Sequence, residues 1–392
     1  MLRPTLVLLP ILMATLTLNA QTRPRARDLQ VPFDGNPGPL NAITDVPGIA
    51  VGHTTLISGE GKLQQGVGPI RTGVTAILPR GSNPAPVFAG YYSQNGNGEM
   101  TGMAWVEESG FAEGPLAITN THSVGVVRDS VIKWQVSEAG RGHRTMPLWS
   151  LPIVAETWDG FLNDINGFHV KEEHVFAALN GAQSGAVPEG AVGGGTGMVC
   201  YGFKGGIGTS SRKLADAAGG YTVGVLVQCN CGRRQQLMIA GVPVGKEIGG
   251  QGPYGMNIAP NGQELGSIII MVATDAPLLP NQLKRLARRA TMGLARTGSI
   301  SGNGSGDLFL AFSTANETAA VQGGKDTVKD AKMLLNEAMD PLFEATVEAT
   351  EESIVNAMVA ADTMTGIEGR TVMGLPHDQL VTVLKKYNRI AH

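Results

Sequence analysis

Short apolar runs, each bounded by glycine, proline or polar residues, recur along the whole chain. Their lengths and their content of valine, isoleucine and other β-formers predict buried β-strands. The runs lie at residues 49–53, 73–78, 115–121, 151–160, 221–228, 267–275 and 308–313, the fourth of them passing from a strand into a loop. One of these runs begins at Ser267, directly after Gly266.

Apolar residues spaced three or four apart predict helices between these strands. Residues 124–134 have this spacing, and Pro280 suits the first position of another helix. The apolar stripe of that second helix is Leu283, Leu286, Ala287, Ala290 and Leu294, and its exposed face is Lys284, Arg285, Arg288 and Arg289. Residues 326–361 are expected to be mostly helical with a break at Pro341, and 377–387 to form a last short helix.

The mixture of strands and helices, without an internal repeat, predicts an α/β (α+β) fold. The 392 residues suffice for one large domain or two ordinary ones, and 42% hydrophobic residues support a sizeable core. The 54 glycines, about twice the usual share, favour tight turns and argue against a helical bundle. A net charge of -3 gives no electrostatic reason to expect binding to nucleic acid or to an acidic membrane.

The first 20 residues have the pattern of a secretory signal peptide. Arg3 supplies the basic start, residues 5–18 the apolar region, and Ala20 a plausible cleavage point. The apolar region is shorter than the ~20 residues that a membrane span needs, and no other stretch is long enough. We therefore expect an exported protein, periplasmic or secreted, that begins at Gln21.

Cysteines and glycine-rich segments point to no cofactor. Cys200, Cys229 and Cys231 are odd in number and lack a CxxC motif or a histidine-rich neighbourhood, so three buried thiols are expected rather than a metal site. The glycine-dense segment 190–211 contains no Gly-Lys-Ser/Thr, which disfavours a phosphate-binding loop.

Two polar features at the ends of predicted strands leave their roles open. Residues 95–102, Asn-Gly-Asn-Gly-Glu-Met-Thr-Gly, fit a hairpin loop, and less commonly a backbone cradle for a ligand. Glu156 follows a buried-looking run; a carboxylate there is usually a solvated turn residue and less often a substrate ligand.

The Gly266-Ser267 pair is the candidate for covalent chemistry. Four Gly-Ser pairs end at Ser82, Ser267, Ser299 and Ser305, and Ser267 alone leads straight into a hydrophobic strand. An ordinary loop end explains the pair on composition alone. The alternative is that the chain is cut before Ser267, after the glycine- and proline-rich segment 245–264, which has the composition of an exposed linker. The new α-amine, whose pKa is ordinarily about 8, would then be the base that activates the serine hydroxyl.

Several segments spread over nearly all of the chain after the signal peptide share one resemblance. They are residues 44–48 (TDVPG), 118–125 (ITNTHSVG), 155–157 (AET), 223–228 (VGVLVQ), 266–267 (GS), 273–278 (ATDAPL) and 304–307 (GSGD). Together, and in this order, they resemble the L-aminopeptidase/D-Ala-esterase and β-peptidyl aminopeptidase family.

The resemblance implies a four-layer αββα sandwich of the ornithine acetyltransferase type and a single catalytic domain over 21–392. It also implies self-cleavage into a larger chain, 21–266, and a smaller chain, 267–392, which assemble into a homo-oligomer, a tetramer of cleaved protomers. No metal or cofactor is implied.

The same resemblance assigns roles to individual residues. The nucleophile is Ser267, assisted by a second serine and an acid, here Ser305 and Asp307, where relatives have glutamate at the acid position. Asn230 is the oxyanion donor, and Glu156 is the carboxylate that holds the substrate ammonium. Trp158 is expected to bind substrate as well, and it stands where some relatives carry a tyrosine.

Three functions remain distinct at this point. The first is an exported aminopeptidase or amidase that acts on short peptides, amides or esters with a free amine. The second is an acyl transferase of the ornithine acetyltransferase type; the nucleophile there is usually threonine and the location cytoplasmic, so Ser267 and the signal peptide count against it. The third is a binding protein without catalysis, whose chain would stay intact.

Overall fold

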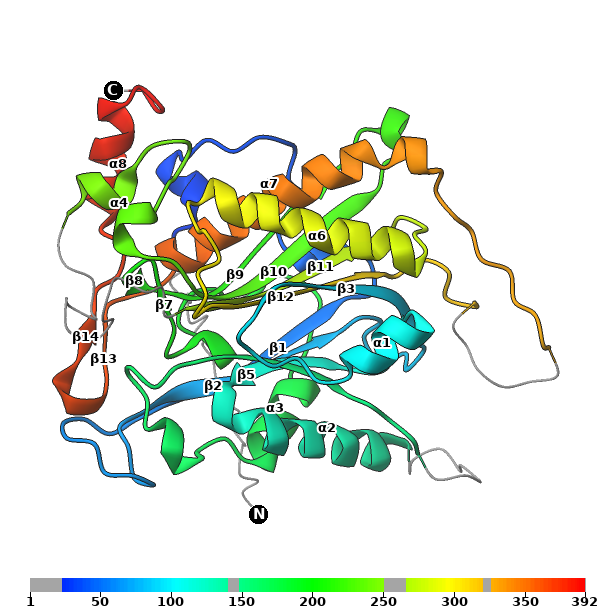
Figure 1. Cartoon of the computed structure of the whole chain (residues 1–392), viewed down its shortest axis with the longest axis horizontal. Helices are drawn as coiled ribbons and strands as arrows, with labels where there is room; N and C mark the ends of the chain where they lie inside the picture. Colours follow the sequence, from blue (N-terminus) through cyan, green and yellow to red (C-terminus); the bar gives the residue numbers. More distant parts are fainter. Residues whose placement is uncertain (1–22, 140–147, 250–265, 320–325, 392) are drawn as a thin grey trace, which may run out of the picture.

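The computed structural model describes residues 23–139, 148–249, 266–319 and 326–391. Its two main β-sheets pack face to face, and helices cover the outer face of each sheet (Figure 1). This four-layer αββα arrangement confirms the predicted fold class.

The smaller sheet has four strands in the order β1-β2-β5-β6. Its strands are β1 (Ala50–Ser58), β2 (Ile70–Leu78), β5 (Leu116–Asn120) and β6 (Ile153–Thr157). β5 and β6 are parallel, so both end at the same edge of the sheet, with Thr119 opposite Glu156. Helices α2 (Val124–Ala139) and α3 (Glu172–Asn180) cover the outer face (Figure 1).

The larger sheet has six strands in the order β4-β3-β12-β11-β10-β9. Its strands are β3 (Val87–Gly96), β4 (Phe111–Ala112), β9 (Gly206–Lys213), β10 (Thr222–Asn230), β11 (Ser267–Thr274) and β12 (Gly306–Ser313). Helices α6 (Pro280–Arg296) and α7 (Asp340–Val359) cover its outer face. The central strand β11 is buried along its whole length, as its unbroken apolar sequence predicts.

Three hydrophobic cores fill the spaces between the four layers. Alternate residues of one strand face different cores, as the period of two in a strand requires. Ile268 packs with α6 and α7, whereas Ile269 packs between the two sheets. The third core fills the space between the smaller sheet and its helices.

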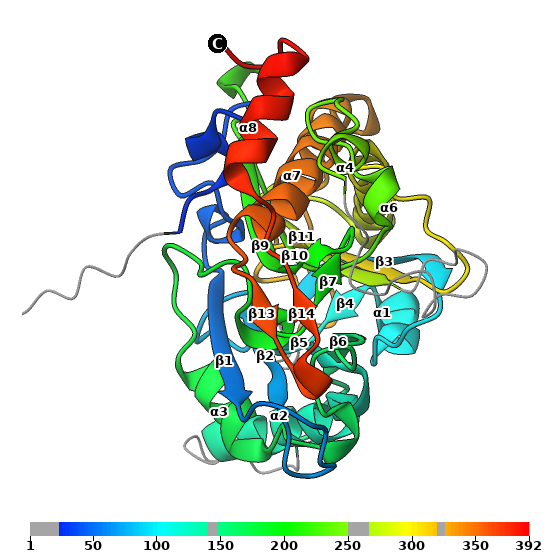
Figure 2. The same ribbon diagram turned by 90° about the vertical axis from the view of Figure 1, so that its left-hand side faces the viewer.

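Shorter elements complete the described chain. They are α1 (Met103–Ser109), β7 (Val199–Cys200), β8 (Phe203–Lys204), α4 (Val244–Glu247), β13 (Met364–Thr365), β14 (Thr371–Val372) and α8 (His377–Lys386). Figure 2 shows the C-terminal segment with β13, β14 and α8 running past both sheets on one side of the molecule.

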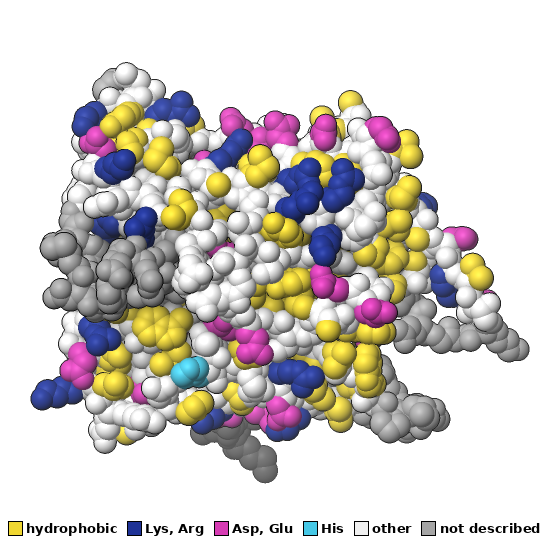
Figure 3. Space-filling model, viewed as in Figure 1, with side chains coloured by type: hydrophobic (Ala, Val, Ile, Leu, Met, Phe, Trp, Pro, Cys, Tyr) yellow, Lys and Arg dark blue, Asp and Glu magenta, His cyan; other side chains and the backbone are white. Residues whose placement is uncertain are grey.

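The helix predicted from Pro280 is confirmed, including its faces. Leu283, Leu286, Ala287, Ala290 and Leu294 are buried. Lysine and arginine side chains gather on the surface over this helix (Figure 3). Arg289 and Arg285 also lie over the ring of Phe343, at 3.8 and 5.2 Å from its centre, so the long polar side chains cover part of α7.

Two predictions along the chain were wrong. Pro341 does not break a helix: α7 begins at Asp340, and the described residues 326–335 contain no helix. Proline is favoured in the first turn of a helix, where its missing N–H has no intrahelical acceptor to serve. Gly245 lies in the short helix α4 and is buried, so the exposed linker cannot begin there.

Other predictions fall on residues outside the described ranges. The signal peptide, residues 1–20, and positions 250–264 of the expected linker belong to this group. Within the described ranges, no helix is both long enough and apolar enough to cross a membrane.

Candidate active site

Four neighbouring strands of the larger sheet each have one end at the same side of the sheet. Asn230, the last residue of β10, pairs with Ser267, the first residue of β11. Ser267 also pairs with Gly306, the first residue of β12, and Gly306 pairs with Gly96 at the end of β3. The strand register therefore brings together residues that are far apart in the sequence.

Ser267 and the peptide bond before it share one hydrogen-bond donor. The backbone N–H of Gly306 donates to Ser267 Oγ at 3.1 Å and to the carbonyl oxygen of Gly266 at 3.2 Å. Ser267 is only 7% exposed. The hydroxyl and the carbonyl group of the preceding residue thus lie together at a buried position with an N–H group beside them.

Glycine at position 266 has a local cause. A Cβ atom there would lie 2.6 Å from the carbonyl oxygen of Asn230 and 2.7 Å from the Cα of Cys231. Backbone atoms cannot move aside as a flexible side chain can, so the close approach of the two segments requires glycine.

Ser305 and Asp307 lie on either side of Gly306 and contact each other. Ser305 Oγ donates to Asp307 Oδ1 at 2.6 Å, and both side chains are fully buried. The aspartate therefore reaches Ser305 although its side chain is one methylene shorter than the glutamate that the family resemblance leads one to expect.

The strand alternation places the Asp307 carboxylate and the Ser267 hydroxyl on different faces of the sheet. Asp307 shares its face with Phe309, which packs among the helices, whereas Ser267 shares its face with Ile269 between the sheets. The two residues can therefore interact through the backbone of β11 and β12 rather than by direct contact of their side chains.

Asn230 is held by two hydrogen bonds. Its Oδ1 accepts from the N–H of Val199 at 2.8 Å, and its Nδ2 donates to the carbonyl oxygen of Trp158 at 3.1 Å. The Nδ2 group has a second N–H with which it can donate to a substrate atom. Trp158 thus meets the site through its backbone, while its side chain is 39% exposed.

Glu156 is a buried carboxylate, 4% exposed, and not a solvated turn residue. Its Oε1 accepts from the backbone N–H of Glu99 at 2.9 Å, and its Oε2 accepts from the hydroxyl of Thr121. Burial raises the pKa of Glu156 above its ordinary value, while the hydrogen bonds from Thr121 and Glu99 oppose that rise. A cation beside this carboxylate would restore a favourable environment for its charge.

The segment after β3 connects Glu156 with Gly306. A Cβ atom on Gly98 would lie 3.3 Å from Glu156 Oε1 and 3.2 Å from the Cα of Gly306. Asn97 Nδ2 donates to the carbonyl oxygen of Gly304 at 2.8 Å. The segment leads from β3 into α1, so it is not the hairpin loop that was one of its two possible roles, and it gives a backbone N–H to Glu156.

Sequence reasoning missed several residues of this site. Asn95 Nδ2 donates to the carbonyl oxygens of Gly302, at 3.1 Å, and of Ser305. Asn97 and Thr121 were also missed. The repeated Asn-Gly pairs were the one available signal for the asparagines, and Thr121 lies inside the segment 118–125 that carries the family resemblance.

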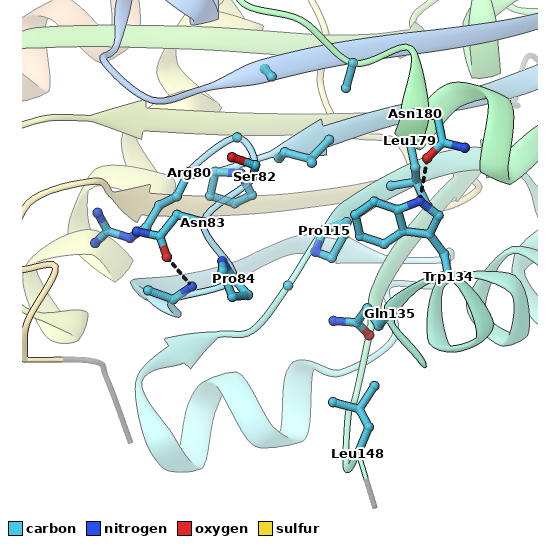
Figure 4. Close-up of a pocket in the computed structure, with 17 residues that line it drawn as sticks. Arg80, Ser82, Asn83, Pro84, Pro115, Trp134, Gln135, Leu148, Leu179 and Asn180 are labelled. Carbon is cyan, nitrogen blue, oxygen red and sulfur yellow. Dashed lines mark hydrogen bonds between the residues drawn. The ribbon is translucent and has the colours of Figure 1, made fainter. Parts of the chain in front are cut away.

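A pocket of about 550 Å³ lies at the other end of the smaller sheet (Figure 4). Pro115 lines this pocket just before β5 begins, whereas Glu156 stands level with the end of β5. Trp134 donates to Asn180 Oδ1 at 2.8 Å in its wall, as Figure 4 shows. None of the residues that line it belongs to the group around Ser267.

Comparisons with known proteins identify the family of this chain. Residues 41–372 match the sequence profile of Peptidase family S58. The chain is 54% identical over 377 residues to the β-peptidyl aminopeptidase BapA of Sphingosinicella microcystinivorans, covering 94% of this chain and 93% of that protein. The chain therefore belongs to Peptidase family S58.

Two solved structures share both fold and sequence. A β-aminopeptidase from Burkholderia sp. is 46% identical with a TM-score of 0.82, covering 92% of this chain and 98% of its own. The L-aminopeptidase D-Ala-esterase/amidase of Ochrobactrum anthropi, described as a variant of the Ntn hydrolase fold, is 45% identical with a TM-score of 0.83, covering 94% of this chain and 100% of its own. The protein described here is an aminopeptidase.

Proposed function

We propose that this chain cuts itself before Ser267 and then releases N-terminal residues, β-amino acids among them, from short peptides, amides or esters with a free amine. The observation that carries the proposal is the position of Gly306, whose N–H donates to both Ser267 Oγ and the Gly266 carbonyl oxygen. A donor at that carbonyl can stabilise the negative charge that develops there when the hydroxyl attacks.

Self-cleavage would proceed in two steps. Ser267 Oγ attacks the carbonyl carbon of Gly266, and the peptide C–N bond breaks as the acyl group moves from nitrogen to oxygen. Water then hydrolyses the resulting ester, which leaves the carboxylate of Gly266 and the free α-amine of Ser267. The products are chains 21–266 and 267–392.

The freed α-amine is the base of the peptidase reaction. It takes the proton from Ser267 Oγ while Oγ attacks the scissile carbonyl, and it returns that proton to the leaving amine. We assign the second N–H of Asn230 Nδ2 to the oxyanion, a contribution worth ~3 kcal/mol in comparable sites. Ser305 and Asp307 orient the strand end that carries the amine.

Glu156 selects the substrate by pairing with its ammonium group. A charge-assisted hydrogen bond to a buried carboxylate is stronger than one between neutral groups, so a free amine is favoured over a blocked one. The relative at 54% identity is named a β-peptidyl aminopeptidase, which supports β-peptides as one substrate class.

Export and assembly are part of the same proposal. The pattern of residues 1–20 supports a signal peptide and a periplasmic or secreted enzyme. The family resemblance supports a tetramer of cleaved protomers.

Mass spectrometry of the denatured protein tests the proposal directly. Wild type should give two chains that copurify, and Ser267→Ala one uncut, inactive chain. Ser82→Ala is the matched control, because Ser82 is exposed and also follows a glycine. Normal cleavage of Ser267→Ala would show that Ser267 is not the attacking group.

A further inference from the structure

The three cysteines of the chain come together in the interior. Cys200 is the last residue of β7, Cys229 lies in β10, and Cys231 follows β10 directly. All three are buried, and none forms a disulfide. This agrees with the expectation of buried thiols, but their arrangement goes beyond it.

The sulfur atoms form a compact triangle. Cys231 Sγ lies 3.8 Å from Cys200 Sγ and 3.8 Å from Cys229 Sγ. All three sulfur atoms are within 4.8 Å of one another. Three thiols from two separate segments thus point at one place.

We propose that Cys200, Cys229 and Cys231 form a binding site for one thiophilic divalent metal ion of the zinc and cadmium class. A Zn–S bond of about 2.3 Å places the sulfur ligands of a tetrahedral ion about 3.8 Å apart. Two of the three sulfur pairs have that separation. The ion takes three protein thiolates, and a fourth ligand comes from a small molecule such as water or chloride.

Lys204 lies close enough to Cys200 and Cys229 to interact with their charges. Binding releases three thiol protons, so a divalent ion with three thiolates carries a net charge of -1. The side-chain nitrogen of Lys204 is completely buried and donates to the carbonyl oxygens of Met198 and Gly205, both at 2.8 Å. Burial lowers the pKa of Lys204 to about 7, and a nearby anion would favour its protonated form.

Backbone contacts hold the triangle in place. A Cβ atom on Gly205 would lie 2.3 Å from the carbonyl oxygen of Cys229 and 2.9 Å from Cys200 Cβ, so only glycine allows this approach. The N–H of Tyr201 donates to the carbonyl oxygen of Cys231 at 2.6 Å. The ligands are therefore arranged in advance, which lowers the cost of ordering them when an ion binds.

The three-cysteine site adjoins the active site through Asn230. Cys229 and Cys231 flank Asn230, whose side chain faces the space between the sheets. A bound ion would tie β7 to the end of β10 and fix the backbone that carries Asn230. The inference depends on neither self-cleavage nor substrate, so it stands or fails apart from the proposed function.

Cadmium is the probe, because cadmium thiolates have an absorption band in the ultraviolet that reports binding directly. Purified full-length protein is reduced, freed of metal with a chelator and titrated with Cd²⁺. We expect one ion per protomer by native mass spectrometry, together with a thiolate-to-cadmium absorption band. Cys200→Ser and Cys231→Ser should each lose the band and bind at least about tenfold more weakly.

Tyr201→Phe is the matched control, because it alters the same buried segment but keeps all three thiols. It should bind cadmium as wild type does. Absence of the band in wild-type protein that is folded and active overturns the proposal, and so does equal binding by Cys200→Ser. A native mass two hydrogens lower without metal uptake would show a disulfide between two of the three cysteines instead and would also overturn it.

Discussion

Gly266 lies so close to Asn230 that a methyl group on its Cα would be 2.6 Å from the Asn230 carbonyl oxygen. The residue before the nucleophile and the candidate oxyanion donor are therefore fitted to each other through their backbones. The fit explains in steric terms why glycine precedes Ser267.

Gly266→Ala is expected to slow self-cleavage. Inserting a methyl group into a packed site costs about 1–3 kcal/mol, and here the strain displaces the scissile carbonyl from the N–H of Gly306. We expect at least about a fivefold lower cleavage rate, followed by mass spectrometry after expression.

Gly125→Ala is the control for that change. Position 125 lies in the helix α2, and a Cβ atom there would meet no heavy atom within 4 Å. Its cleavage should match wild type. Equal cleavage rates for Gly266→Ala and Gly125→Ala would contradict the steric account.

Asp307 is expected to act through Ser305. Asp307→Asn removes the charge that Ser305 Oγ donates to, and a hydrogen bond to a charged group contributes ~1.5–3 kcal/mol. We expect kcat to fall by about ten- to a hundredfold in Asp307→Asn and by a similar factor in Ser305→Ala.

The double variant tests this coupling. If both residues act as a unit, Asp307→Asn with Ser305→Ala is no worse than either single variant. Additive losses in kcat, with unchanged thermal stability, would show that the two residues act separately.

The strands and helices could be predicted because their signals are local, whereas the four-layer arrangement came from the family resemblance. Apolar runs specify strands, and the apolar stripe after Pro280 specifies its helix. The family resemblance assigned roles to Asn230, Ser267 and Ser305, and the structure places Asn230 and Ser267 opposite each other on paired strands. The prediction at Pro341 was wrong, because proline is compatible both with the end of one helix and with the first turn of another. Only the residues packed around α7 determine which of the two forms.

Contacts between distant segments could not be predicted. Position 306 requires glycine, because a Cβ atom there would lie 2.4 Å from the carbonyl oxygen of Asn97. The burial of Glu156 likewise depends on the segment after β3 folding over it. The meeting of Cys200 with Cys231 depends on the short strand β7, which has no strong apolar run to reveal it.

Glu156→Gln should fold and cut itself but lose activity on free-amine substrates. Self-cleavage involves no substrate ammonium, whereas removing one partner of a desolvated charge pair costs ~2–5 kcal/mol. We expect kcat/KM on an aminoacyl p-nitroanilide to fall at least about 30-fold. Glu108→Gln is the control, because Glu108 is an exposed carboxylate in α1.

Blocked substrates provide the complementary measurement. N-acetylated p-nitroanilides should be poor substrates for wild type, since they carry no ammonium. Equal rates on acetylated and free-amine substrates would mean that Glu156 does not hold an ammonium.

Thr121 should set the pH range in which the substrate amine binds. Burial raises the pKa of Glu156, and the Thr121 hydroxyl opposes that rise by donating to the ionised carboxylate. Thr121→Val removes the donor, so the pKa of Glu156 rises further and the carboxylate is protonated at a higher pH. A protonated Glu156 cannot pair with an ammonium, so KM should increase as pH falls through this pKa.

We expect the acid limb of a plot of 1/KM against pH to move to higher pH in Thr121→Val and to stay in place in Thr121→Ser, which keeps the hydroxyl. The α-amine of Ser267 titrates in both variants alike, so it cannot cause a difference between them. An acid limb that is the same in wild type and Thr121→Val would show that the hydroxyl does not stabilise the charge on Glu156.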